Sequence, residues 1–140
     1  MLEVETPILG RAGNSDPNIH SIATDSPRKR FLRTSPEYAM KRLLASGLAN
    51  IYEVGRVFRA GENGQYHNPE FTMVEWYRSG MGYLELAAEV LQLVRHCGAG
   101  AFTGWSERRV TYRDLFREHI GLDPFHCSET DLASCAAERG

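Results

Sequence analysis

The hydrophobic pattern of this chain changes its period several times. Apolar and acidic residues alternate over Leu2–Glu5, which predicts a short strand that stops at Pro7. The stretch Gly10–Pro27 is rich in Gly, Asn, Ser, Asp and Pro, which is typical of a loop. A short strand is expected at Ser21–Thr24 inside this stretch and another at Phe31–Arg33 after it.

A helix is predicted over about residues 36–46, where apolar side chains recur every three or four positions. Ser35 suits the N-cap, Pro36 the first helical position, and Glu37 the first turn, where the helix dipole favours negative charge. Gly47 suits the C-cap. The start and the end of this helix are therefore both marked in the sequence.

Two longer strands are expected at residues 51–59 and 70–78, paired as an antiparallel hairpin. The connection Ala60–Pro69 exceeds the ~2–5 residues usual in hairpins, a length typical of a functional loop. Periodicity and capping signals predict three more helices, at Tyr83–His96, Thr111–His119 and Thr130–Arg139. The fold class that follows is α+β, with an antiparallel sheet flanked by helices.

Composition narrows the class of protein. The chain has 140 residues, of which 42% are hydrophobic and 24% charged, which indicates one globular domain. A net charge of −2 argues against a broad nucleic-acid surface. No signal peptide or membrane-spanning run occurs, so a cytoplasmic protein is expected. An odd number of cysteines without a C-x-x-C pair predicts reduced thiols and no metal site (Cys97, Cys127, Cys135).

The predicted hairpin carries charged and aromatic residues on the same face. Strand alternation puts four residues of the second strand on one side (Phe71, Met73, Glu75, Tyr77). It does the same for the first strand (Glu53, Gly55, Val57, Arg59). Because unpaired charge is costly to bury, this face is either solvated with incidental ion pairs or lines a polar pocket.

Two segments of the chain resemble class II aminoacyl-tRNA synthetases. Residues 52–78, with Tyr-Glu-Val-Gly-Arg-Val-Phe-Arg and His-Asn-Pro-Glu-Phe-Thr-Met, are similar to motif 2 of the lysyl branch, and residues 2–7 to the end of motif 1. Thr34–Tyr38, Lys41–Leu44 and Glu75–Arg78 resemble most closely the shortened lysyl-tRNA synthetase paralogues that lysylate elongation factor P. Motif 3 is absent, so residues 1–140 are expected to be part of such a catalytic domain, a fragment or a truncated product.

The resemblance implies an ATP site, with Mg²⁺ ligands outside this segment. Arg59 would be catalytic, because a permanently charged guanidinium can neutralise the α-phosphate. Gly61 occupies the usual position of an adenine-reading Glu, so either Glu62 or backbone groups would hold adenine. Phe71 would stack on adenine. The implied ATP-binding residues are Arg59, Gly61, Glu62, His67, Asn68 and Phe71.

The resemblance also implies an amino-acid site and an activity. Lysine or β-lysine would be bound by Ser35, Pro36, Glu37, Glu75 and Tyr77, with Glu37 taking the backbone ammonium. The expected activity is formation of an aminoacyl-adenylate and transfer to a lysine side chain of elongation factor P, by a homodimer formed through motif 1. Two alternatives remain: part of a lysyl-tRNA synthetase with tRNA as acceptor, or an inactive binding or dimerisation module.

Overall fold

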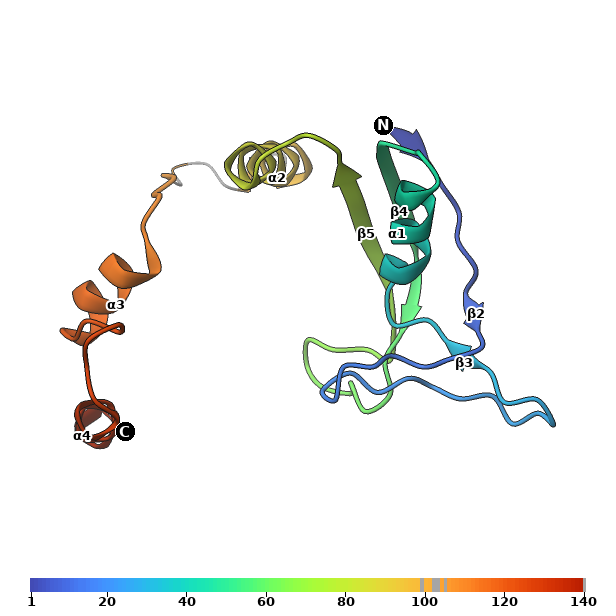
Figure 1. Ribbon diagram of the computed structural model, residues 1–140. Helices are drawn as coiled ribbons and strands as arrows, with labels where there is room; N and C mark the ends of the chain where they lie inside the picture. Colours follow the sequence, from blue (N-terminus) through green and yellow to red (C-terminus); the bar gives the residue numbers. More distant parts are fainter. Residues whose placement is uncertain (99, 102–103, 105, 140) are drawn as a thin grey trace. The chain divides into compact units, whose positions relative to one another are not determined.

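The computed structural model describes residues 1–98, 100–101, 104 and 106–139. Figure 1 shows its elements, which in chain order are β1 (Leu2–Glu3), β2 (Leu9–Gly10), β3 (Phe31–Leu32), α1 (Glu37–Ala45), β4 (Asn50–Phe58), β5 (Glu70–Arg78), α2 (Tyr83–Gly98), α3 (Tyr112–Ile120) and α4 (Glu129–Arg139). The chain forms two compact units, residues 1–92 and 93–140. The assignment of residues 1–140 to one catalytic domain stays a prediction.

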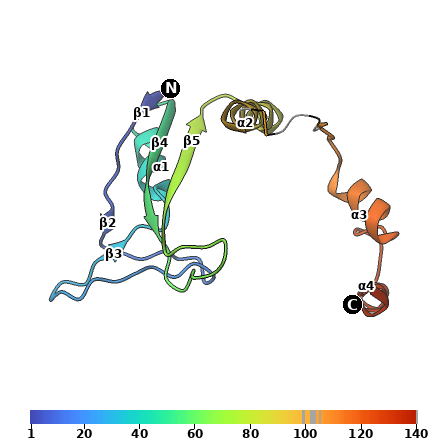
Figure 2. The ribbon, with the colours of Figure 1, turned by 180° about the vertical axis from the view of Figure 1, so that it is seen from behind.

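The central feature of the first unit is the β4–β5 hairpin, seen from behind in Figure 2. Its strands pair antiparallel over their whole length, with Glu53 opposite Glu75 and Val57 opposite Phe71. β1 joins β4 in parallel, so the sheet order is β1-β4-β5. The α+β class and the antiparallel hairpin are confirmed. The parallel strand was not predicted, because alternation alone carries no information on strand direction.

A two-stranded sheet lies beside this hairpin. β2 pairs antiparallel with β3, and the sequence analysis had not singled out β2. The strand expected at Ser21–Thr24 does not form; only Ala23 makes an isolated bridge, to Phe31. The strands predicted at Leu2–Glu5 and Phe31–Arg33 are both shorter, two residues each. Proline and glycine around these segments interrupt the ladders that longer strands require.

Helix α1 begins at Glu37, one residue after Pro36, which the sequence analysis had placed at the first helical position. Pro36, not Ser35, occupies the N-cap, and no side chain caps it. The Ser35 hydroxyl instead accepts a hydrogen bond from the Glu37 N–H at 3.1 Å. At the other end Ser46, not Gly47, is the C-cap; Gly47 follows it with φ +105° and donates its N–H to the Leu44 carbonyl at 3.0 Å.

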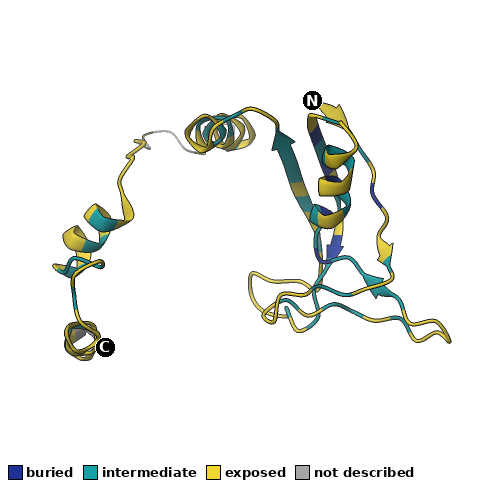
Figure 3. Ribbon diagram, viewed as in Figure 1, coloured by how far each residue is buried: buried dark blue, intermediate teal, exposed yellow. Residues whose placement is uncertain are grey.

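Burial in the first unit is concentrated between α1 and β4, as Figure 3 shows. Among the described residues the fully buried apolar side chains are Met40, Ile51 and Val57. Three polar side chains are buried with them, Thr6, Thr34 and Glu53. The polar groups must be hydrogen-bonded to be tolerated there, which directs attention to this face of the sheet.

The second unit consists of helices with local caps. Thr111 is the N-cap of α3, accepting from the Asp114 N–H at 3.1 Å, so this helix starts one residue later than predicted. Ser128 and Asp131 cap α4 reciprocally, a signal that the sequence analysis had not used. No α3 residue is buried. The three cysteines are free, as expected.

No helix among the described residues is long and apolar enough to cross a membrane.

Candidate functional site

Two carboxylates lie next to each other on the face of the sheet that α1 covers. Glu53 and Glu75 are direct cross-strand neighbours, and strand alternation turns both to the same side. Like charges directly opposite each other on a sheet destabilise it unless partners compensate. The two carboxylates have different partners, and this difference defines the site.

Glu53 is held by an arginine and a hydroxyl. Its Oε1 lies 2.5 Å from Arg33 Nη1 and its Oε2 accepts from the Thr6 hydroxyl at 2.7 Å. Arg33 Nε also donates to the Arg56 carbonyl at 2.9 Å. The two ionised side chains are 8% and 4% exposed, so this is a buried ion pair with its donors and acceptors satisfied.

Space for the Arg33 guanidinium comes from Gly55. A Cβ added at Gly55 would collide with the guanidinium, so a larger residue here would require Arg33 to shift from its position beside Glu53. The sequence analysis missed Arg33 altogether. The signal was available, because Glu53 falls on an inward position of a strand and a buried carboxylate requires a cation.

Among the described residues, the partners of Glu75 are hydroxyl groups. Ser35 Oγ donates to its Oε2 at 2.6 Å, and the Tyr77 hydroxyl donates to its Oε1 at 2.8 Å. No cationic side chain within the described ranges forms an ion pair with Glu75. Burial raises the pKa of Tyr77, and its hydrogen bond to the Glu75 carboxylate raises it further, so the phenol stays a donor.

Glu37 belongs to the same group of side chains but has a different partner. Its carboxylate pairs with Lys41 at 2.5 Å, one helical turn away and well exposed. The hydrogen bond from Lys41 to Glu37 raises the lysine pKa above its ordinary value. The Pro36 carbonyl accepts from the N–H groups of Ala39 and Met40, so this residue serves to start the helix.

Arg59 lies directly after β4 and stacks on an aromatic ring. Its guanidinium carbon is 5.2 Å from the centre of the Phe71 ring, so both side chains lie on one face of the hairpin. Arg59 Nε donates to the Thr34 carbonyl at 3.3 Å. Because Ser35 follows Thr34 and binds Glu75, this short segment connects the arginine to the carboxylate group.

The loop after Arg59 contributes one side chain to this arrangement. Glu62 pairs with Arg59 at 3.6 Å, and Gly61 adopts φ +81°, which favours glycine. His67 and Gly64 form an isolated backbone bridge, in which the Gly64 N–H donates to the His67 carbonyl at 3.1 Å. Both His67 and Asn68 are exposed, and neither side chain makes a hydrogen bond within the described part of the chain.

The arrangement combines an unpaired carboxylate with hydroxyl donors and, one segment away, a guanidinium over an aromatic face. A carboxylate of this kind suits an ammonium, and the guanidinium suits phosphate oxygens. No group of three or more His, Cys, Asp or Glu in the described residues could hold a metal ion.

Residues 1–125 match the family described as tRNA synthetases class II (D, K and N). The chain is 41% identical to the elongation factor P--(R)-beta-lysine ligase of Vibrio parahaemolyticus over its whole length. It is 40% identical to the protein of that name from Pseudoalteromonas translucida, and 38% identical over 97% of the chain to that of Haemophilus influenzae. The chain spans 43–44% of the length of these relatives. The family match covers the hairpin, α1 and the segment that connects Arg59 to Glu75, and the chain therefore belongs to the class II tRNA synthetases of the D, K and N group.

Proposed function

We propose that this chain is the part of an ATP-dependent ligase that recognises ATP and lysine or β-lysine. The ligase forms an aminoacyl-adenylate and transfers the aminoacyl group to a lysine side chain of elongation factor P. The names of the relatives support the acceptor, and membership of a synthetase family supports the adenylate chemistry. The reaction belongs in the cytoplasm, where translation factors work, with Mg²⁺ held by residues outside this chain.

The Glu75 carboxylate is the observation that carries the proposal. Its neighbour Glu53 has Arg33, whereas Glu75 has two hydroxyl donors and no cation among the described residues. A half-buried carboxylate gains most from a partner that brings both positive charge and N–H donors. An ammonium group of the amino acid fits, with Ser35 and Tyr77 orienting the carboxylate. Glu37 would take the backbone ammonium in exchange for Lys41.

Arg59 is the candidate catalytic residue. In adenylation an oxygen of the amino-acid carboxylate bonds to the α-phosphorus, and the bond from that phosphorus to the bridging oxygen breaks to release pyrophosphate. A guanidinium placed beforehand stabilises the negative charge that gathers on the α-phosphate oxygens. The acceptor amine then attacks the adenylate carbonyl, loses a proton, and AMP leaves with the bonding electron pair.

Phe71 would stack on adenine. The Arg59 guanidinium now lies over the Phe71 ring. Glu62 pairs with Arg59, so binding of phosphate would compete with this ion pair and free the Glu62 carboxylate. The freed carboxylate could then accept from the adenine amino group, with the backbone at Gly61 as the alternative. His67 and Asn68 lie on the exposed loop and would close on the nucleotide.

The test is Glu75→Gln in the full-length protein, with Glu70→Gln as the matched control. Glu70 lies on the same strand and pairs with Arg56 in an exposed ion pair. Loss of a charged hydrogen bond costs about 1.5–3 kcal/mol, so the KM for lysine should rise roughly tenfold or more. Pyrophosphate exchange measures this, and the KM for ATP and the control should stay unchanged.

The acceptor is tested separately by offering preformed adenylate to elongation factor P and to tRNA. Transfer to elongation factor P alone supports the proposal, and transfer to tRNA alone supports the lysyl-tRNA synthetase alternative. A full-length protein without lysine-dependent pyrophosphate exchange would leave only the binding or dimerisation module. Equal effects of the Glu75 and Glu70 substitutions would contradict the role given to Glu75.

A homodimer through residues 2–7 is part of the same proposal. Near this segment apolar side chains are exposed, with Leu2 at 55% and Leu9 at 50%. β1 is an edge strand of the sheet, and such edges favour association. Leu2→Glu should therefore shift the mass measured by light scattering from dimer to monomer, whereas an unchanged mass would contradict this interface.

A further inference from the structure

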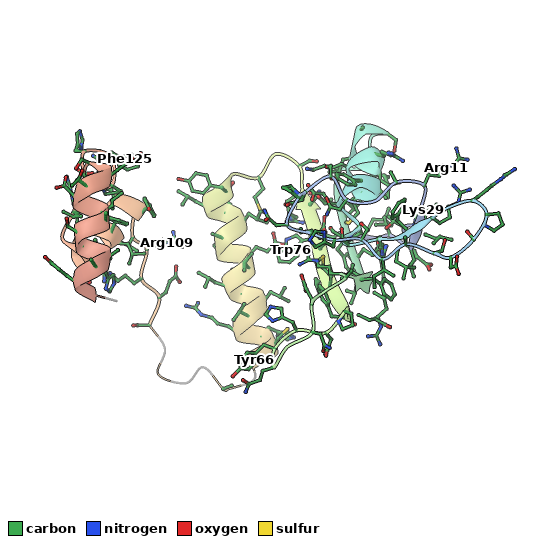
Figure 4. All side chains as sticks on the ribbon, turned by 90° about the horizontal axis from the view of Figure 1, so that it is seen from below. Arg11, Lys29, Tyr66, Trp76, Arg109 and Phe125 are labelled. Carbon is green, nitrogen blue, oxygen red and sulfur yellow. The ribbon has the colours of Figure 1, made fainter. Side chains whose placement is uncertain are left out.

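Cations without an acidic partner gather in one part of the first unit. Most described Lys and Arg side chains pair with a carboxylate. The exceptions form a set that we name the basic edge: Arg11, Arg28, Lys29, Arg30 and Arg42. Figure 4 labels Arg11 and Lys29, which lie at the end of this unit that carries β2 and β3. The unpaired positive charge is therefore localised.

The charge of the chain is segregated in the same way. Residues 11–33 contain five basic and two acidic residues, whereas the rest of the chain contains 11 basic and 16 acidic residues. Neighbouring like charges repel each other and give the folded state no stability of their own. A partner with negative charge would offset that repulsion.

The basic edge is built on hydrogen-bonded backbone. The Thr24 N–H donates to the Arg30 carbonyl at 2.8 Å, which closes a hairpin whose tip carries Arg28 and Lys29. Gly10 pairs with Phe31 in the β2–β3 ladder, so Arg11 and Arg30 each directly adjoin a paired residue. The backbone that carries these charges is thus ordered before any partner arrives, which lowers the entropy lost on binding.

The basic edge leads to the candidate site. A cavity of about 680 Å³ is lined by Arg11 and Arg42 and also by Ser35, whose hydroxyl donates to Glu75. A macromolecule docked on the basic edge would therefore lie beside the wall of the amino-acid site. This position suits the acceptor of the aminoacyl group.

We infer that the basic edge docks an acidic surface of the protein acceptor, an inference that rests on the proposed function. A protein fits better than RNA for two reasons. The excess of positive charge is confined to one edge of a chain whose net charge is −2, whereas a nucleic-acid surface needs a broad basic area. Lys29 also lies over one face of Phe31, the aromatic residue of this hairpin, at 5.4 Å, so that face is not free for base stacking.

The experiment compares two triple variants of the full-length protein. Arg28→Gln, Lys29→Gln and Arg30→Gln remove the tip of the basic edge, and Arg95→Gln, Arg108→Gln and Arg109→Gln remove exposed charge elsewhere. Transfer to elongation factor P should fall about tenfold for the first variant at low salt and approach wild type at high salt, because screening weakens such docking. The first variant should keep its rate of pyrophosphate exchange, and the control variant should keep its rate of transfer.

Three outcomes would overturn the inference: full transfer by the first variant, equal losses in both variants, or displacement of the acceptor by unacylated tRNA. If the triple variant does not fold, Lys29→Gln at the exposed tip must show a smaller loss with the same salt dependence. If wild type lacks exchange, the proposed function fails instead. Direct titration of elongation factor P against both variants then still decides whether the basic edge binds it.

Discussion

Polar side chains in the two units find their partners at different distances along the chain. In residues 1–92, Thr6 bonds to Glu53 across 47 positions and Ser35 to Glu75 across 40. In residues 93–140, Arg117 pairs with Asp123 across 6 positions. The long-range contacts exist only when the sheet has formed, whereas the local ones need a single helix and its cap. Substitutions should therefore affect stability and chemistry in the first unit and little in the second.

The largest expected effect tests the buried ion pair against an exposed one. Arg33→Leu would leave Glu53 buried without its cation, which should lower the free energy of unfolding by about 3–5 kcal/mol. Arg108→Leu removes the exposed partner of Glu118 and should leave the urea midpoint unchanged. Similar shifts for both variants in urea titrations of the full-length protein would remove the distinction between the units.

A second test uses two arginines that stack on phenylalanine rings. Arg59 lies 5.2 Å from Phe71 in the first unit, and Arg113 lies 4.9 Å from Phe125 in the second. Arg59→Ala should slow adenylate formation by an amount equivalent to about 2–4 kcal/mol, the loss seen when one stabiliser of transition-state charge is removed. Arg113→Ala should leave the rate of pyrophosphate exchange unchanged.

The same assay separates two roles for Arg59. A loss in turnover greater than the loss in ATP binding supports a role in the transition state. Equal losses would make Arg59 a ground-state contact, and an unaffected rate would remove it from the site.

Tyrosine hydroxyls give a smaller effect. Tyr77→Phe deletes one of the two donors to Glu75, which should weaken lysine binding by about 1–3 kcal/mol and leave the KM for ATP unchanged. Tyr112→Phe, at a 64% exposed ring of the second unit, is the control and should change neither constant. If Tyr77→Phe raises only the KM for ATP, Tyr77 does not act on the amino acid.

The smallest effect concerns pH and lies in the second unit. Partial burial alone would raise the pKa of Asp123, but the Phe125 N–H, His126 and two arginines outweigh it and lower the pKa to about 2. A carboxylate whose pKa is lower in the folded state stabilises the fold fully above its unfolded pKa, which is about 3.9 for Asp. The contribution of Asp123 to the free energy of unfolding is therefore lost as the pH falls from about 3.9 toward 2. NMR titration should show this carboxylate ionised at pH 3. Asp123→Asn should not change adenylation.

Much of the first unit could be predicted from local pattern. The helix expected at 36–46 is Glu37–Ala45, and the strands expected at 51–59 and 70–78 are Asn50–Phe58 and Glu70–Arg78. Long periodic segments carry their own signal, because each residue repeats the same spacing. Two-residue strands such as β2 carry almost none, since only pairing with another strand defines them.

The arrangement of the candidate site was likewise predictable only in part from the sequence. Strand alternation correctly put Glu75 and Tyr77 on one face, and the structure joins them through a hydrogen bond of 2.8 Å. The carboxylate of Glu37, in contrast, pairs with Lys41. The roles of these residues in binding stay predictions until the variants are measured.

The sequence by itself determined which residues could be helical or extended and which face of each strand they occupy, because these properties depend on neighbours in the chain. Only the tertiary structure decided that Arg33 pairs with Glu53 and that no cation of the described residues pairs with Glu75. The choice depends on which segments the folded sheet and α1 bring within hydrogen-bond distance, and on the space that Gly55 leaves above the strand. Neither the proximity of these segments nor the space at Gly55 can be read from the spacing of residues along the chain.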